Sequence, residues 1–155
     1  MRQGFTELAA CEGYIAVGDK SGNVWLCADP ALPSEPAAEP DAAAGGRLWL
    51  ATTHWQAKRV TGVCVCARAG VVLSGSLDGT LHVCRLSPRP PADEAAAARL
   101  AEGVAPAGVT AMALVGDERR AVVGCTNGML CIADMTALPK LGVQVAACPG
   151  RPALF

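Results

Sequence analysis

The chain of 155 residues has few aromatic side chains, few charges and no long apolar run. Aromatic residues make up 4% of the sequence and charged residues 17%, so a core must be built from Val, Leu, Ile, Ala and Cys. The formal net charge of −1, from 13 Lys and Arg against 14 Asp and Glu, gives no strong field for nucleic acid or an anionic membrane. No stretch reaches the roughly 18 consecutive apolar residues of a membrane span. With 52% hydrophobic residues, we expect a globular protein that does not cross a membrane.

The start of the chain has no signal-peptide pattern. Arg2 and Glu7 lie among the first residues, and no long unbroken apolar stretch follows them. The asparagines, Asn23 and Asn127, are not followed by the Ser or Thr of a glycosylation acceptor. We therefore expect an intracellular protein, in the cytoplasm, with the nucleus as the alternative.

Eight cysteines are spread over the sequence, and none forms a Cys-x-x-Cys pair. Cys64 and Cys66 would point to the same face of a strand, which suits packing better than tetrahedral metal ligation. Imidazole ligands could come only from His54 and His82, at no recognised spacing. We expect reduced cysteines that act as small core side chains, and neither a metal nor a cofactor. A disulfide and a metal site stay open as alternatives. The other cysteines are Cys11, Cys27, Cys84, Cys125, Cys131 and Cys148.

Three segments repeat one pattern: an apolar run, a Gly, and a second Gly four positions later that follows Ser, Asp or Asn. A second apolar run comes after it. Residues that tolerate a positive φ are typical of a tight turn between antiparallel strands. The pattern therefore predicts three β-hairpins, in the segments 14–26, 71–83 and 121–132.

Further strands are predicted before and after these hairpins. Val60-Thr61 and Val109-Thr110 lie at the same distance before the hairpin glycines of the second and third segments, and each pair begins a strand. The predicted first strands are 5–10, 60–67 and 109–115, and the predicted fourth strands are 47–53, 98–101 and 141–147. Runs such as 62–67 are apolar at consecutive positions, which indicates burial on both faces. The sequence predicts an all-β fold of four-stranded antiparallel meanders that stack face to face.

Repeated four-stranded meanders packed on both faces are the blades of a β-propeller. The segment 75–83, which reads Gly-Ser-Leu-Asp-Gly-Thr-Leu-His-Val, resembles the WD-repeat β-propeller family, as does Val60-Thr61 upstream. At the family's Trp-Asp signature the chain has Cys27-Ala28, Cys84-Arg85 and Ala133-Asp134. The resemblance implies a partial β-propeller of about three four-stranded blades.

The expected organisation is a single propeller-like domain over 1–155. Its approximate repeats are 1–53, 54–102 and 103–148. Two Pro- and Ala-rich insertions, 28–46 and 87–94, lengthen the repeats beyond the usual length of about 40–45 residues; they are solvated loops or a partner-binding face. A closed propeller generally needs four to eight blades, and three leave two apolar faces open. We expect a longer chain, self-association or another protein to complete the ring.

Propellers of this family mostly bind proteins through the turns at one end of the ring. The resemblance therefore implies a non-catalytic protein–protein interaction scaffold that assembles a multiprotein complex. Trp55, between His54 and Lys58, is the sharpest candidate contact, because exposed Trp is a typical hot-spot residue; the alternative is that Trp55 packs inward at a blade edge. The candidate contact residues are Asp19, Lys20, Ser21, His54, Trp55, Lys58, Arg59, Leu77, Asp78, Thr126 and Asn127.

Two other classes of function receive little support. An enzyme is not expected, because the sequence has no Gly-x-Ser-x-Gly motif and no phosphate-binding loop. His82 and Cys84 could share one face of a strand, but no third group orients them. The alternative function is a propeller subunit of an RNA-containing or regulatory assembly. The scattered Lys and Arg residues are not interleaved with aromatic residues, so we do not expect a dedicated nucleic-acid binder.

Overall fold

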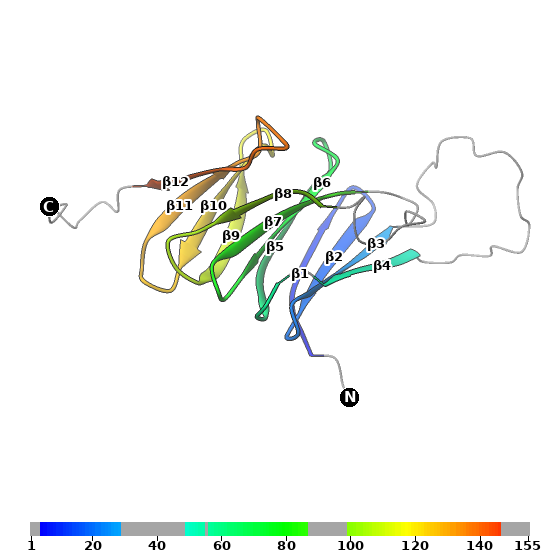
Figure 1. The fold of residues 1–155 in the computed structure, drawn as a ribbon. Helices are drawn as coiled ribbons and strands as arrows, with labels where there is room; N and C mark the ends of the chain where they lie inside the picture. Colours follow the sequence, from blue (N-terminus) through cyan, green and yellow to red (C-terminus); the bar gives the residue numbers. More distant parts are fainter. Residues whose placement is uncertain (1–3, 29–48, 55, 87–98, 147–155) are drawn as a thin grey trace, which may run out of the picture.

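The structure, a computed structural model, describes residues 4–28, 49–54, 56–86 and 99–146. These residues form twelve strands and no helix (Figure 1), so none of their segments is a helix that could span a membrane. The strands make three antiparallel four-stranded sheets, each connected in chain order from one edge to the other. This arrangement confirms the predicted all-β fold of three meanders.

We call the three sheets the first, middle and third blades. The first blade contains β1 (Phe5–Cys11), β2 (Tyr14–Asp19), β3 (Asn23–Ala28) and β4 (Trp49–His54). The middle blade contains β5 (Val60–Cys66), β6 (Val71–Ser76), β7 (Thr80–Arg85) and β8 (Arg99–Val104). The third blade contains β9 (Val109–Val115), β10 (Arg120–Cys125), β11 (Leu130–Asp134) and β12 (Gly142–Ala146). The observed strands overlap all the predicted ones, and the largest difference is at β8, which continues to Val104 instead of ending at 101.

The turn of each repeated hairpin is closed by the same backbone hydrogen bond. The amide of the second glycine donates to the carbonyl three residues before it, at 2.9–3.4 Å. These glycines, Gly22, Gly79 and Gly128, have φ angles of +87°, +90° and +79°. A residue with a side chain is strained in that left-handed region, whereas glycine is not. This explains why the glycine recurs in all three repeats.

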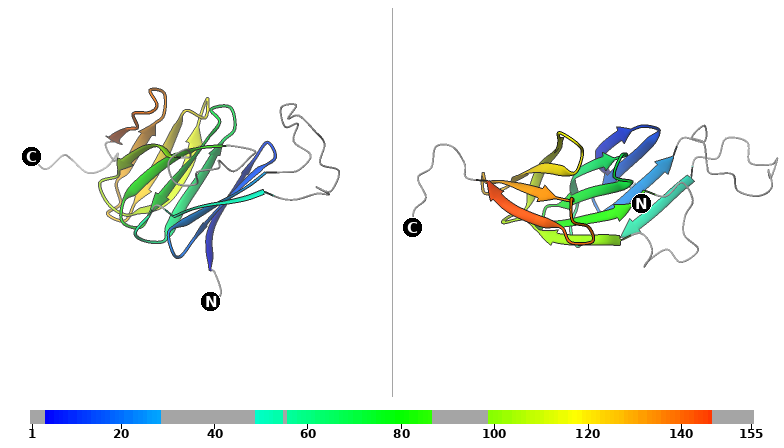
Figure 2. Two further views of the ribbon diagram at one scale, coloured as in Figure 1. Left: turned by 45° about the vertical axis from the view of Figure 1, so that its right-hand side comes forward. Right: turned by 90° about the horizontal axis from the view of Figure 1, so that it is seen from above.

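The three blades stand side by side in an open arc, with their first strands on the inner side (Figure 2). The first strand of the middle blade, β5, contacts both β1 and β9. Each end blade packs on the middle blade with one face, and the described residues do not close the arc into a ring.

The middle blade is packed on both faces, and every residue of β5 and β6 is buried. Successive side chains of β5 alternate between two cores. Val63 and Val65 join the core against the first blade, whereas Cys64 and Cys66 join the core against the third. This alternation confirms burial on both faces, as the consecutive apolar residues indicate.

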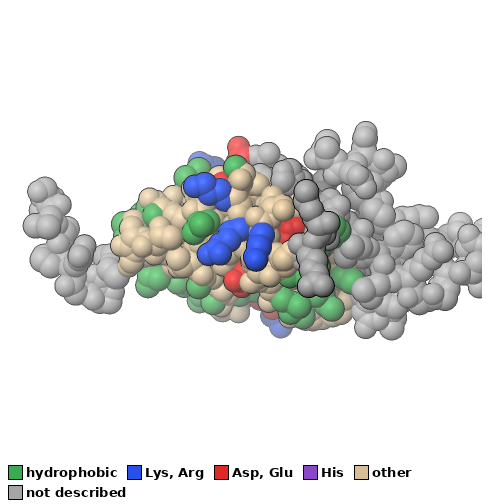
Figure 3. Space-filling view, turned by 90° about the horizontal axis from the view of Figure 1, so that it is seen from below, with side chains coloured by type: hydrophobic (Ala, Val, Ile, Leu, Met, Phe, Trp, Pro, Cys, Tyr) green, Lys and Arg blue, Asp and Glu red, His purple; other side chains and the backbone are tan. Residues whose placement is uncertain are grey.

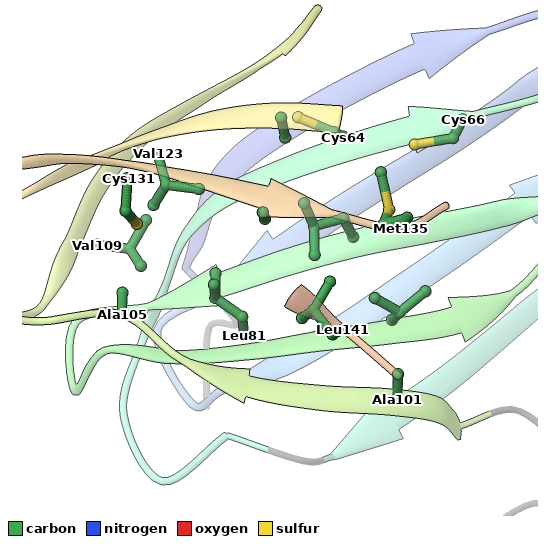
Figure 4. Packing of buried hydrophobic residues seen from close by; sticks show 14 of the residues in the cluster. Cys64, Cys66, Leu81, Ala101, Ala105, Val109, Val123, Cys131, Met135 and Leu141 are labelled. Carbon is green, nitrogen blue, oxygen red and sulfur yellow. The ribbon is translucent and has the colours of Figure 1, made fainter. Parts of the chain in front are cut away.

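The larger core lies between the middle and third blades (Figure 4). Leu81 projects into it from the middle blade, and Val109, Val123 and Cys131 project into it from the third. Seven cysteines fall within the described residues; all are free thiols, and all but Cys11 are buried. They serve as small core side chains, as the sequence predicts.

The two predicted insertions, 28–46 and 87–94, lie outside the described residues except at one position. Ala28 is the last residue of β3, where it pairs with Tyr14 on one side and Trp49 on the other. The first insertion therefore begins after Ala28 and not at it, because the strand ladder continues through this residue.

The close approach of the blades predicts that substitutions at two glycines differ in their effect on the stability of the protein. A Cβ atom at Gly18 would lie 2.4 Å from Cγ1 of Val60, so the first and middle blades would have to move apart. We expect Gly18→Ala to lower the free energy of unfolding by about 1–3 kcal/mol in urea denaturation. In the control, Gly142→Ala, the new Cβ meets no atom nearer than 3.5 Å, and the change stays within about 1 kcal/mol. Equal unfolding midpoints would contradict the close packing.

Candidate interaction face at the hairpin turns

One end of the arc gathers the hairpin turns and the segments that lead into the inner strands. The backbone amides of Lys20, Leu77 and Thr126 each donate to the residue just before the first strand of the same blade, at 2.7–3.2 Å. Figure 3 looks onto this end and shows Lys and Arg side chains gathered near its middle. We call this end the turn face and define it by Lys20, Ser21, Lys58, Arg59, Leu77, Asp78, Thr126 and Asn127.

These eight residues are all predicted contact residues, so most of the prediction falls on one surface. Leu77 and Asp78 are half-buried, and the other six are exposed. His54 is the last residue of β4, where its backbone pairs with Asn23. Trp55, the sharpest candidate in the sequence, lies outside the described residues.

Asp19 departs from the prediction, because its side chain is only 1% exposed. Oδ1 accepts from the backbone amides of Ser21 and Asn23 at 2.8 and 2.9 Å. Oδ2 accepts from Nδ2 of Asn23 at 2.7 Å and from the indole of Trp25 at 3.0 Å. Burial by itself would raise the pKa of Asp19, but these hydrogen bonds outweigh it and hold the pKa below its ordinary value of 3.8. Asp19 therefore stabilises the first hairpin, and we withdraw it as a contact residue.

A cavity of about 270 Å³ opens where the three inner strands begin. Thr6, Thr61 and Thr110 contribute to its walls, each as the second residue of its strand and each at a β-bulge. A bulge redirects a side chain, and here Thr6 Oγ1 donates to the carbonyl of Val60 at 2.6 Å. Thr61 Oγ1 donates in the same way to the carbonyl of Val109 at 2.5 Å. The sequence marks these residues as strand starts, but only the packed blades bring them around one cavity.

The cavity is lined by one cation, Arg59, and one anion, Glu7, and the turn face adds Lys20, Lys58 and Asp78. Lys20, Lys58 and Arg59 are exposed cations. On the acidic side, Glu7 is exposed, and the Asp78 carboxylate already accepts two hydrogen bonds within its own turn. Burial would raise the pKa of Asp78, but its hydrogen bonds and the charge of Lys58 lower it overall. The turn face can therefore attract a carboxylate-bearing ligand.

The side chains that the sequence offers for nucleophilic chemistry lie in the core and not on the turn face. Cys84 is fully buried, and His82 is 4% exposed. Burial raises the pKa of the Cys84 thiol to about 12 and that of Cys64 to about 11. These thiols are protonated at neutral pH, whereas the thiolate is the reactive form.

Among the solved structures that share this arrangement of strands are two β-propeller domains. The WD40 β-propeller domain of Doa1 matches with a TM-score of 0.61 and 13% sequence identity, over 88% of this chain and 39% of that one. The β-propeller domain of Cps50 (Swd1) from Myceliophteria thermophila matches with a TM-score of 0.64 and 16% identity, over 99% of this chain and 42% of that one. The chain has a WD40 propeller fold. This confirms the predicted partial propeller, and the chain spans about two fifths of the length of these two propellers. No family model and no curated protein matches the sequence.

The buried carboxylate predicts a loss of stability on substitution. Asp19→Ala leaves the indole of Trp25 and three other donor groups without their acceptor. We expect the free energy of unfolding to fall by about 2–3 kcal/mol in urea denaturation followed by tryptophan fluorescence. The control is Asp134→Ala, since Asp134 accepts only from Thr136 in an exposed turn; its loss is about 1 kcal/mol or less. A larger loss for the control would contradict the role of Asp19.

The same carboxylate predicts a pH dependence. Because the pKa of Asp19 in the folded protein lies below 3.8, its ionised form stabilises the fold above about pH 3.8, and this contribution disappears as the pH falls through the folded-state pKa. We expect the stability difference between the wild type and Asp19→Asn to be constant from about pH 7 to 5 and to shrink below about pH 4. A difference that does not change down to about pH 2.5 would show that Asp19 does not carry this charge effect.

Proposed function

We propose that this chain is a protein–protein interaction scaffold without catalytic activity, which helps to assemble a multiprotein complex. The observation that carries the proposal is the turn face, where Lys20, Lys58 and Arg59 are exposed and Arg59 lines a cavity of about 270 Å³. The WD40 propeller fold supports a general scaffold role. The burial of Cys84 and His82 supports a non-catalytic role, and the free, buried thiols support a location in the reducing cytoplasm.

The proposed partner is a protein segment that combines acidic side chains with an apolar one. The three cations attract carboxylates and speed the encounter. Leu77, which is half-buried and lines the cavity, offers the apolar contact. The turns are fixed by backbone hydrogen bonds to the residues just before the inner strands, so the partner meets a prearranged surface.

Charge reversal on the turn face tests the proposal. The chain and its variant Lys58→Glu/Arg59→Glu are each used to capture proteins from the source cells, and the bound proteins are quantified by mass spectrometry. We expect the wild type to retain a defined protein at a fixed ratio, and the variant to retain about tenfold less or lower still, because the new charges repel the acidic segment.

The matched control reverses two exposed cations at the opposite end of the blades, in the variant Arg119→Glu/Lys140→Glu. This variant keeps the partner if the turn face is the binding surface. Loss of the partner in the control alone would contradict the proposal. Loss of the partner from the wild type after ribonuclease treatment would favour the RNA-containing assembly instead.

A further inference from the structure

Two adjacent cations of the turn face, Lys58 and Arg59, lie outside regular secondary structure. They directly precede β5, and neither belongs to a helix or a strand. Holding such a segment in one conformation costs conformational entropy, which contacts to the rest of the fold must offset. The contacts of this backbone therefore decide where the two positive charges are held.

A single buried hydroxyl holds the backbone of both cations. Oγ of Ser76, the last residue of β6, donates to the carbonyl of Lys58 at 3.1 Å and to the carbonyl of Arg59 at 3.1 Å. Ser76 is fully buried. A serine hydroxyl has one proton to donate, so the two carbonyls share it in a three-centre hydrogen bond. The backbone amide of Leu77 donates to the carbonyl of Arg59 as well, at 3.2 Å.

The shared hydrogen bond imposes a shape on this backbone. Along an extended strand, successive carbonyls point to opposite sides. Here the successive carbonyls of Lys58 and Arg59 converge on one hydroxyl, so the chain curves around Ser76. Because the direction of a side chain depends on the conformation of its backbone, this curve determines how the two cations project into solvent. Both side chains are exposed.

The same hydroxyl joins the cations to the hairpin turn of the middle blade. The carboxylate of Asp78 is a further hydrogen-bond acceptor beside the Ser76 side chain, and the charge of Lys58 also acts on this carboxylate. Ser76 therefore lies where the segment that carries Lys58 and Arg59 meets the turn that carries Leu77 and Asp78. The arrangement of these four turn-face residues depends on it.

The hydroxyl is specific to the middle blade. The backbone hydrogen bond of the Leu77 amide has a counterpart in each of the three blades. At the position of Ser76, however, the first blade has Asp19, whose carboxylate accepts hydrogen bonds within its own hairpin. The third blade has Cys125 there. Within the described ranges, this serine thus occurs only in the blade that carries the two adjacent cations.

We propose that Ser76 is a positioning residue of the turn face, whose hydroxyl holds Lys58 and Arg59 in the arrangement that receives the acidic segment of the partner. This inference rests on the proposed function of the turn face. Because Ser76 is fully buried, it acts through the two cations and does not touch the partner. Cations that are held in place before binding lose less conformational freedom on association, which favours affinity.

Amide hydrogen exchange of the variant Ser76→Ala tests the structural part of the proposal. We expect the amide of Leu77 to exchange about five- to tenfold faster than in the wild type, because its acceptor on Arg59 is no longer held by the hydroxyl. The corresponding amides of Lys20 and Thr126 should exchange at the wild-type rate, since their blades have no such serine. Unchanged exchange at Leu77 would overturn the proposal.

A double-mutant cycle tests whether Ser76 acts through the cations. The probe is a fluorescent synthetic peptide of alternating glutamate and leucine, and its affinity is measured by fluorescence anisotropy. We expect Ser76→Ala to weaken binding by about five- to tenfold, although the net charge of the chain is unchanged. In the background Lys58→Ala/Arg59→Ala, the same substitution should change the affinity by less than about twofold. Equal weakening in both backgrounds, which a general loss of stability would give, would contradict the proposal.

The matched control is Ser74→Ala. Ser74 is a second fully buried serine of β6, and its hydroxyl accepts from Nε2 of Gln56 at 3.2 Å. We expect this variant to keep the peptide affinity within about twofold of the wild type. A loss as large as that of Ser76→Ala would count against a specific role of Ser76. If Ser76→Ala does not fold, Ser76→Cys takes its place, since a thiol has a similar size and is a weaker donor.

Failure of this inference and failure of the proposed function give different results. If Lys58→Ala/Arg59→Ala binds the peptide as the wild type does, or the wild type does not bind it, the proposed function of the turn face is wrong and the role of Ser76 falls with it. If that variant loses the peptide but Ser76→Ala keeps it, the turn face binds as proposed and only the role of Ser76 is wrong.

Discussion

The close approach of each inner strand to a glycine of the blade before it is the constraint on which the rest of the structure depends. Val60 can lie over Gly18, and Val109 over Gly75, only because these glycines have no side chain. This approach sets the distance between blades, and the alternating side chains of β5 fill the cores on both sides. It also brings the bulged threonines within hydrogen-bonding distance of the next blade. The apolar packing and the polar contacts thus have one geometric origin.

The same constraint places the turn face. Because each blade repeats the spacing between bulge, glycine and turn, the three hairpin turns lie at one end of the arc, and the cavity lies between the starts of the inner strands. The exposed cations of the turn face come from two places in the chain. Lys20 follows β2 of the first blade, and Lys58 and Arg59 precede β5 of the middle blade. Such a surface supports the proposed scaffold function, since loops on a rigid framework can vary in chemistry without changing the fold.

Much of the fold could be predicted from local patterns, whereas the site could be predicted only in part. The turn glycines predicted the hairpins correctly, because the need for a positive φ at a turn depends only on the local sequence. The predicted contact residues at the turns lie at one end of the arc for the same reason, and their role in binding stays a prediction. Asp19 was interpreted wrongly as a surface contact, since its carboxylate is buried by accepting from Ser21 and Asn23 within the turn and from Trp25 across the hairpin. The cavity was missed because its threonines belong to three different blades.

The sequence by itself determined the strands, the hairpin turns and the burial of the middle blade on both faces, because these follow from φ preferences and from apolar residues at successive positions along one strand. Only the tertiary structure decided which faces meet, which carbonyls accept from Thr6 and Thr61, and which charges gather at one end. Those features depend on distances between residues about 50 positions apart, and chain packing sets such distances, not local conformation.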